Sequence, residues 1–222
     1  MKSQITVFLI IAFVFIFSIT ACHKNDTIKD IDGNVYKTVI IGKQIRLAEN
    51  LNTSHFLTGD TIPEAKTVNE WLKALENHNA AWCYYDYNLI NGKKYGKLYN
   101  FFAINSNLKF ALVGWHISKD EEWTQLTNFL GKEDIAGKEM KSTFGWKENK
   151  KNSNSSGFTG LPGGYILNGI FEGIDSSGIW WSSPQYNSYI TSFLYLNYKY
   201  NFVMRDLPDP MMYGLSVRCV KD

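Results

Sequence analysis

Apolar residues recur at helical spacing in the stretch 114–131. The apolar stripe falls at positions i, i+3 and i+7 and consists of Trp123, Leu126 and Leu130. Such a stripe predicts an amphipathic helix. Ser118 and Glu121 have the spacing of a capping box at its start, and Gly131 can supply the left-handed residue that ends it. This stretch therefore predicts the central helix of the domain.

A second stretch with helical periodicity follows Thr67. Thr67 and Glu70 form another capping box, and the apolar positions that follow are Val68, Trp71, Leu72 and Leu75. Their spacing predicts a helix from Val68 to Asn77. One further short helix is expected over 135–141.

Short apolar runs separated by turn residues fill the rest of the chain. Asp32-Gly33 predicts a hairpin whose return strand spans 35–41, and a strand over 44–48 follows. The segments 86–94 and 147–157 are polar and predict surface loops. From Phe158 onward the expected strands lie in FTGLPGGYIL, IFEGI, GIWWSS, YITSFLYLNY, NFVMRDL and YGLSVRCVKD. Helices come early and strands late, without alternation, so the sequence predicts an α+β fold with a mainly antiparallel sheet.

The first 21 residues have the order of a bacterial export signal. Lys2 precedes a nearly unbroken apolar run over 5–19, and small residues stand just before Cys22. This order is typical of a cleaved signal peptide. Ile19-Thr20-Ala21-Cys22 also resembles the bacterial lipobox, in which the cysteine becomes the lipidated first residue. The alternative is an uncleaved transmembrane anchor, because the run is close to the lower length limit for a span.

Charge and length limit what the mature chain can be. The full chain has a formal net charge of +2, and its signal peptide contains a single lysine and no acid. The mature chain is therefore nearly neutral, which does not favour nucleic acid as a partner. About 200 residues remain, enough for one domain. We expect a lipidated tether over 22–29 and a single domain over 30–222.

Two cysteines remain in the mature chain besides Cys22. An exported protein meets an oxidising compartment, where Cys83 and Cys219 can persist as a disulfide. The alternative is a pair of buried free thiols.

The sequence offers little for catalysis or metal binding. His116 stands between Trp115 and Ile117 and is expected to be a packed, hydrogen-bonded residue. The serines of the Trp-Trp-Ser-Ser phrase lack the nucleophile elbow. The acidic spacing over 30–34 lacks the later ligands of a calcium loop, so it predicts a turn and gives calcium no support. We expect no enzyme activity, no cofactor and no metal site.

Aromatic residues next to polar loops are the candidate ligand contacts. A sugar ring can stack on a flat aromatic face while its hydroxyl groups bond to nearby polar groups. The candidate residues are Tyr85, Asp86, Tyr87, Trp181 and Tyr186. The alternative is that these aromatic side chains belong to the core, since half of the positions in a strand face inward. Trp180 and Trp181 are adjacent, so they should face opposite sides of a strand.

Several short sequence motifs follow one another along the chain. They are Asp32-Gly33-Asn34-Val35-Tyr36, Leu47-Ala48-Glu49-Asn50-Leu51, Tyr95-Gly96-Lys97-Leu98-Tyr99-Asn100, Gly114-Trp115-His116 with Glu122-Trp123, Leu161-Pro162-Gly163-Gly164-Tyr165, Trp180-Trp181-Ser182-Ser183 and Ser216-Val217-Arg218-Cys219-Val220. In this order they resemble the Fibrobacter succinogenes major paralogous domain family, found in envelope lipoproteins. The resemblance covers 30–222. We call these phrases the signature motifs.

The resemblance has implications for fold and function. The family is similar in layout to C-type-lectin-like and formylglycine-generating-enzyme-like domains. This similarity implies two main helices, a mixed but mainly antiparallel sheet, long loops and neighbouring chain ends. We expect a lipoprotein anchored in a bacterial membrane, at the outer membrane facing periplasm or exterior. Its non-catalytic domain would bind a glycan or a surface protein. The alternatives are a structural part of a surface assembly and an enzyme of the formylglycine-generating type.

Overall fold

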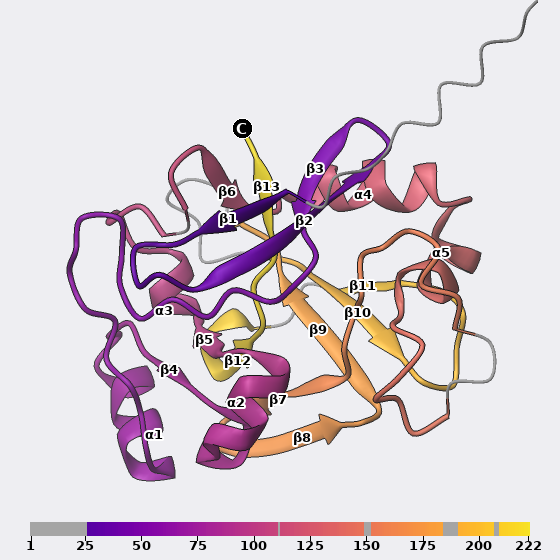
Figure 1. The fold of residues 1–222 in the computed structure, drawn as a ribbon. Helices are drawn as coiled ribbons and strands as arrows, with labels where there is room; N and C mark the ends of the chain where they lie inside the picture. The colour runs from indigo at the N-terminus through magenta and orange to yellow at the C-terminus, as the bar shows by residue number, and fades with distance from the viewer. Residues whose placement is uncertain (1–25, 111, 149–151, 184–190, 207–208) are drawn as a thin grey trace, which may run out of the picture.

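The computed structural model describes residues 26–110, 112–148, 152–183, 191–206 and 209–222. One sheet has five strands, all paired antiparallel. Its order is β1 (Thr27–Lys29), β2 (Val35–Ile41), β3 (Gln44–Leu47), β13 (Cys219–Lys221) and β6 (Trp115–Ile117). The C-terminal strand β13 therefore lies beside the N-terminal hairpin, as the sequence predicted (Figure 1). β1 pairs with β2 and lies within the segment 22–29 that we expected to be a tether.

The second sheet has eight strands and holds most of the C-terminal half. Its order is β11 (Met204–Asp206), β10 (Phe193–Asn197), β9 (Ser177–Trp181), β7 (Gly163–Leu167), β12 (Tyr213–Leu215), β5 (Leu98–Asn100) and β4 (Trp82–Cys83), with β8 (Ile170–Ile174) paired to β7. The pairing of β7 with β9 is parallel, and the other named pairs are antiparallel. The predicted α+β class with mainly antiparallel sheets is confirmed.

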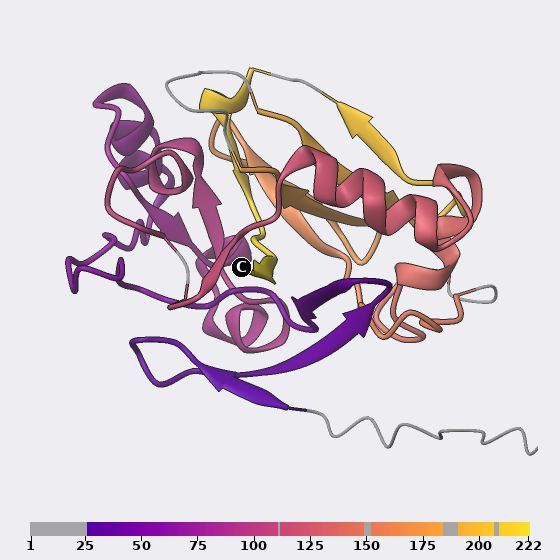
Figure 2. The same cartoon turned by 90° about the horizontal axis from the view of Figure 1, so that it is seen from above.

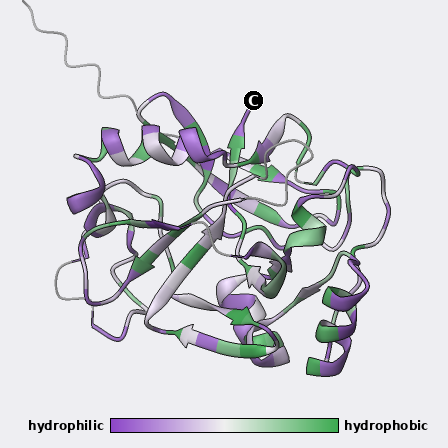
Figure 3. Ribbon diagram, turned by 180° about the vertical axis from the view of Figure 1, so that it is seen from behind, coloured by the Kyte–Doolittle hydropathy of each residue, from purple (hydrophilic) through white to green (hydrophobic). Residues whose placement is uncertain are grey.

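In the part of the chain that the structure describes, five helices and two single turns surround the sheets. They are α1 (Val68–Glu76), α2 (Leu89–Tyr95), α3 (Phe101–Ile104), α4 (Asp120–Phe129) and α5 (Glu133–Met140), with 3-10 turns η1 (Tyr85–Tyr87) and η2 (Pro210–Met212). Hydrophobic and hydrophilic residues alternate along α1 and α4 (Figure 3). Trp71 of α1 and Trp123 and Leu126 of α4 are buried, as predicted. Val68 and Leu72, which also belong to the predicted apolar stripe of α1, are exposed. No helix in the described part of the chain is long and apolar enough to cross a membrane.

The central helix starts one residue later than the sequence predicted. Lys119 is the cap of α4, and its backbone N–H donates to the Glu122 carboxylate at 2.8 Å. Ser118 is fully buried instead, where its hydroxyl donates to the Arg218 carbonyl at 2.9 Å and accepts from Arg46 at 3.0 Å. The Ser118 hydroxyl is thus bonded to Arg46 and Arg218 in the core and does not cap the helix. Gly131 ends the region with φ +95°, as expected.

The segment 86–94, predicted as a loop, contains the helix α2. The side chain of Asn88 caps this helix by accepting from the Ile90 N–H at 2.8 Å. A Cβ on Gly92 would lie 2.2 Å from the Tyr84 ring, so the glycine lets α2 pack directly on that ring. The helix carries no regular apolar stripe, which is why periodicity missed it.

Strand β9 is buried on both faces. Trp180 belongs to a core cluster with Trp123 and Leu194, whereas Trp181 belongs to another with Tyr99 and Leu215. The two rings therefore point to opposite sides of the strand, as predicted. Each side is covered, so neither ring reaches the surface.

Candidate functional site

Three of the aromatic residues proposed from the sequence as ligand contacts, Tyr85, Tyr87 and Trp181, pack against other parts of the domain. Trp181 is fully buried, and its ring N–H donates to the Tyr99 carbonyl at 2.8 Å. Tyr85 is buried, and both Tyr85 and Tyr87 pack against Phe171 of β8 with ring centroids 5.0 and 4.9 Å apart. The contacts with Phe171 hold η1 against β8, and the rings of Tyr85 and Tyr87 are occupied by this packing. Asp86 alone of these residues is exposed. Tyr186 lies outside the described residues.

The predicted disulfide is absent. Cys83 and Cys219 are free thiols, each fully buried, on β4 and β13 of different sheets. Burial raises the pKa of both thiols, so both stay protonated at neutral pH. They are core residues, in line with the alternative drawn from the sequence. The lipidation position Cys22 lies outside the described residues.

The acidic spacing over 30–34 forms the predicted turn. Asp30 accepts from the backbone N–H groups of Asp32 and Asn34, at 3.0 and 2.9 Å, and from the Tyr36 hydroxyl at 2.5 Å. These donors use the oxygens that a cation would need. Among the described residues, no group of three or more acidic, histidine or cysteine side chains is placed to hold a metal ion.

Four signature motifs meet at one buried amide. Asn50 Oδ1 accepts from Trp180 Nε1 at 2.8 Å and from Arg218 Nε at 2.7 Å. Asn50 Nδ2 donates to the Tyr95 carbonyl at 2.7 Å and to Ser216 Oγ at 3.2 Å. All four hydrogen-bonding positions of the amide are thus used. This buried node joins segments far apart in the sequence and therefore serves the fold.

Arg218 is the charged member of the buried node. It is fully buried, and burial lowers its pKa to about 9. Its guanidinium also donates to the carbonyls of Leu47, Phe158 and Thr159 at 2.7–3.1 Å and lies over the Phe158 ring. Carbonyl dipoles and an aromatic face thus solvate the cation in place of a counter-ion.

His116 joins the start of α4 to the end of the chain. Its Nδ1 lies 2.6 Å from Asp222 and its Nε2 lies 2.9 Å from Glu122. The bond to Glu122 raises the pKa of His116 against the opposing effect of partial burial, and Asp222 adds to the rise. The predicted hydrogen bonding is confirmed, although 27% of the side chain stays exposed. Both ring nitrogens of His116 are bonded, one to Glu122 of α4 and one to the C-terminal residue Asp222. We call this linkage of α4 to the chain end the clamp.

A polar hollow lies between the end of α1 and the segment after α3. It has a volume of about 500 Å³ and is lined by His78, Asn79, Ala80, Phe102, Asn105, Ser106, Asn107 and Leu108. The His78 ring stacks on the Phe102 ring, with centroids 4.9 Å apart and planes inclined by 23°. His78 has φ +55°, an uncommon conformation for a non-glycine residue. We call this hollow the polar lobe.

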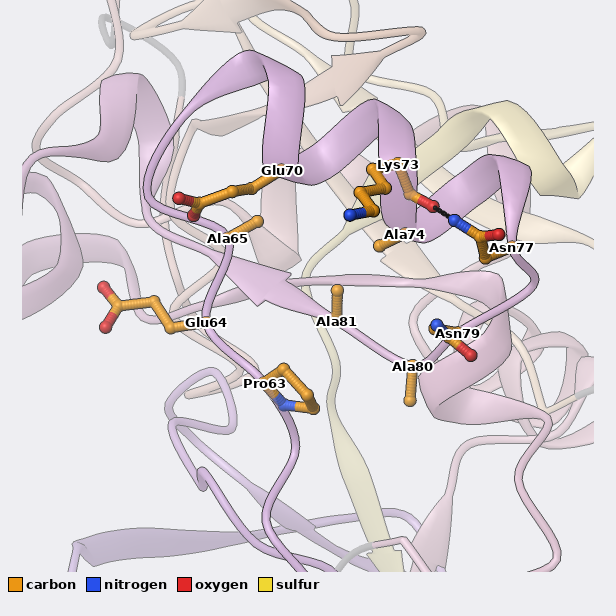
Figure 4. A pocket seen from close by; sticks show the side chains of 10 residues that line it. All are labelled: Pro63, Glu64, Ala65, Glu70, Lys73, Ala74, Asn77, Asn79, Ala80 and Ala81. Carbon is orange, nitrogen blue, oxygen red and sulfur yellow. Dashed lines mark hydrogen bonds between the residues drawn. The ribbon is translucent and has the colours of Figure 1, made fainter.

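A second hollow continues on the other side of Asn79 and Ala80. This apolar lobe, of about 260 Å³, has small apolar side chains between α1 and the strand-like segment beside it (Figure 4). Pro63, Ala65, Ala74 and Ala81 supply them, and Glu64, Glu70, Lys73 and Asn77 supply its polar side chains. The two lobes share Asn79 and Ala80 in their linings, and we call them together the groove.

A buried asparagine holds the wall of this groove. Asn100 Nδ2 donates to the Asn79 carbonyl at 2.8 Å, and its Oδ1 accepts from the backbone N–H groups of Ala81 and Ala103 at 3.0 Å. One side chain thus ties the segment 79–81 to α3. Asn100 is the last residue of a signature motif. A residue of the family motifs therefore holds the backbone that lines the groove.

The groove has the chemistry of a binding site. The side chains of Asn79, Asn105 and Asn107 make no hydrogen bond to any other residue that the structure describes. Their amides, with the His78 ring, can each donate and accept toward a ligand. In the same part of the chain, no serine, histidine or cysteine lining the groove is bonded to a base. This arrangement suits recognition more than nucleophilic chemistry.

No local pattern in the sequence predicts the groove. Its lining comes from two separate segments, 63–81 and 102–108, and its amides stand in polar stretches that resemble any loop. No lining residue belongs to a signature motif. The uncommon backbone of His78 and the pairing of the two segments through Asn100 become visible only in the structure.

These features define an α+β domain with two sheets, a polar node in its core and a groove on its surface. The chain belongs to the Fibrobacter succinogenes major domain family, whose model matches residues 39–221. The family predicted from the signature motifs is therefore confirmed. No curated protein and no solved structure matches the chain.

Proposed function

We propose that this protein is an envelope lipoprotein whose domain binds a glycan, without catalysis, in the groove beside α1. The observation that carries the proposal is the set of free amides in the polar lobe, next to the stacked rings of His78 and Phe102. An amide donates and accepts at once, so it can bond to two neighbouring hydroxyl groups of a sugar. An aromatic edge or face beside it can cover the apolar side of the sugar ring.

The shape of the groove also supports this ligand class. The volume of the polar lobe lies within the usual range of small-molecule sites. The apolar lobe adjoins it at Asn79 and Ala80, which would offer a place for a second unit of a linear chain. We therefore favour an oligosaccharide over a single sugar.

The anchor and the finer fold are part of the same proposal. Cys22 would carry the lipid and hold the domain at the outer membrane, facing periplasm or exterior. The neighbouring chain ends and the mixed sheet agree with a C-type-lectin-like arrangement. A formylglycine-generating activity has less support, because Cys83 and Cys219 are buried on separate sheets.

The test is a glycan-array screen of the chain from His23 onward, with calcium and with chelator. We expect saturable binding that chelator leaves unchanged. For the best glycan, Asn105→Ala and His78→Ala should each weaken binding about tenfold, the loss of one or two hydrogen bonds. Asn128→Ala, an exposed amide on α4, is the matched control and should bind normally. Silence across a broad array, or equal effects of all three changes, would refute the proposal.

A further inference from the structure

Exposed aromatic side chains gather at one end of the domain. Among the described residues, those with 36% or more of their surface exposed are Phe129 (64%), Phe144 (55%), Tyr200 (44%) and Phe202 (36%). All seven tryptophans are buried. Exposed aliphatic side chains are scattered over α1, α2, β2, β8 and several loops, and one of them, Ile135 (52%), lies on α5. We call the region of these four residues the aromatic end.

The four residues come together around α5. Phe129 closes α4, Phe144 follows α5, and Tyr200 and Phe202 lie on the turn between β10 and β11. That turn is bonded to α5 through Lys138 N–H to Asn201 O at 3.2 Å and Val203 N–H to Glu133 O at 2.8 Å. In Figure 1 the last turn of α4, α5 and the β10–β11 turn occupy the same side of the molecule.

The turn that carries Tyr200 and Phe202 is held in place by buried contacts with Lys141 and Gly137. The buried Lys141 donates from Nζ to the carbonyls of Asn197 and Tyr200, at 3.0 and 2.5 Å. Gly137 of α5 lets the turn approach so closely that a Cβ there would lie 2.6 Å from the Asn201 carbonyl oxygen. The rings of Tyr200 and Phe202 stack at 4.7 Å. The fold thus displays these rings in place, and a fixed apolar patch of this kind marks an interaction surface.

Charge does not explain the patch. Among the described residues, the exposed charged side chains on α5 and the segments beside it are Lys132, Lys147 and Lys199 and, against them, Glu133, Asp134 and Glu148. Lys138 and Glu139 are half-buried, and their charged groups lie 3.9 Å apart. The two signs are evenly matched, so a strongly anionic polymer is not favoured. Aromatic rings among mixed charges suit the boundary between lipid headgroups and acyl chains, where Tyr and Phe are buried without full loss of water.

The start of the described chain lies near this end. The Asp26 backbone carbonyl accepts from the Thr38 N–H at 2.9 Å, and Gly42, four residues after Thr38, directly follows β2. The Phe129 ring packs over Gly42, where a Cβ would lie 3.0 Å from it. Four strand residues span about 13 Å. Asp26 and the aromatic end are therefore close neighbours on the scale of the domain.

We propose that the aromatic end lies on the lipid surface when Cys22 is anchored in it. The proposal rests on the anchor of the proposed function. Four residues lead from Cys22 to Asp26 and span at most about 14 Å, so the surface around Asp26 must stay near the bilayer. The four aromatic side chains then insert at headgroup depth. Because α1 and α5 lie at opposite ends of the molecule (Figures 1 and 2), the groove beside α1 faces away from the membrane.

Quenching by brominated lipids tests this orientation. A chain of residues 22–222 is coupled through Cys22 to a maleimide phospholipid in phosphatidylethanolamine–phosphatidylglycerol vesicles, with the buried Cys83 and Cys219 out of reach. The native tryptophans are buried, so an introduced tryptophan reports on its own surroundings. Phe144→Trp and Tyr200→Trp probe the aromatic end. Ile90→Trp on α2, at a position 75% exposed, is the matched control.

We expect quenching at positions 144 and 200 to exceed that at position 90 by at least about threefold, as for side chains at headgroup depth. Quenching that is equal at all three positions, or strongest at position 90, would overturn the proposal. Chemical coupling replaces natural lipidation, so the quenching result does not depend on whether Cys22 is lipidated in the cell. The glycan array is measured without a membrane, so its result depends neither on lipidation nor on the orientation at the bilayer.

Discussion

Arg218 and Asn50 are 168 positions apart in the chain, and the guanidinium Nε of one donates to the amide oxygen of the other at 2.7 Å. Both side chains are buried. The same amide oxygen accepts from the Trp180 ring at 2.8 Å. The pair thus joins the first sheet, the second sheet and the loop after β3 at a single point.

Replacing Asn50 by alanine should destabilise the domain strongly. The change leaves the Arg218 Nε–H and the Trp180 ring N–H buried without an acceptor, at a cost of about 2–5 kcal/mol. Urea unfolding of the chain from His23 onward measures this loss. Asn128→Ala, on the exposed face of α4, should stay within about 0.5 kcal/mol of the natural protein. Equal stability of the two variants would contradict the role of the buried node.

Both mature-chain thiols should be free and unreactive in the folded protein. Cys83 and Cys219 are fully buried, and burial raises the pKa of each, so the reactive thiolate is scarce. We expect iodoacetamide to modify them at least about 100-fold faster in guanidinium than in native buffer. Mass spectrometry without reductant provides the readout. A peptide pair linked through Cys83 and Cys219 would show that the two strands are bonded after all.

The clamp at His116 should make stability depend on pH. The His116 pKa is raised above 6.5, chiefly by Glu122, so its contribution is complete below 6.5 and is lost as pH rises through the folded value. Burial would raise the pKa of Glu122, but the bonds from His116 and the Lys119 N–H outweigh it and lower that pKa below 4.5. The Glu122 contribution is therefore lost as pH falls through that lowered value. The clamp is strongest between about pH 4.5 and 6.5.

His116→Asn should accordingly cost more stability at about pH 5.5 than at about pH 8.5. Urea unfolding at the two pH values measures the difference. His78→Asn serves as the control, because the His78 ring has no acidic partner among the described residues and contacts Phe102 instead. A cost that is the same at both pH values would mean that the ring acts by packing alone.

Gly137→Ala should destabilise the protein, contrary to helix propensity. In an exposed helix this change is favourable by about 1 kcal/mol. Here the new Cβ would lie 2.6 Å from Asn201 O and 2.9 Å from Phe202 O, so the β10–β11 turn must move. We expect a net loss of about 1–3 kcal/mol and faster proteolysis within 197–206. Asp134→Ala in the same helix should change neither property.

The sequence predicted the elements that carry their own local signal. The hairpin around Asp32-Gly33 and the helices at Thr67 and around Trp123 all combine a turn or cap with a period, and all three are present. The helix α2 was missed because its cap, Asn88, precedes residues without an apolar stripe. The cap of α4 was misplaced by one residue because Ser118 bonds to Arg46 and Arg218, which are distant in sequence.

The candidate site was much less accessible to sequence reasoning. From the sequence, Tyr85, Tyr87 and Trp181 are the kind of aromatic residues that contact a ligand. In the structure the rings of Tyr85 and Tyr87 pack on Phe171. The ring N–H of Trp181 donates to the Tyr99 carbonyl. Which aromatic side chains reach the surface depends on what covers each strand. The groove depends on Asn100 bridging two segments, and such a bridge leaves no pattern in the chain.

The position of the signature motifs has a consequence for how this domain can diversify. Asn50, Trp180 and Arg218 are buried and bonded to one another, whereas the groove beside α1 is built from residues outside every motif. Gene copies can therefore vary His78, Asn105 or Asn107 freely while inheriting the same folding core. A library randomised at the groove positions alone should keep its folded yield, which makes the domain a scaffold for selecting new specificities.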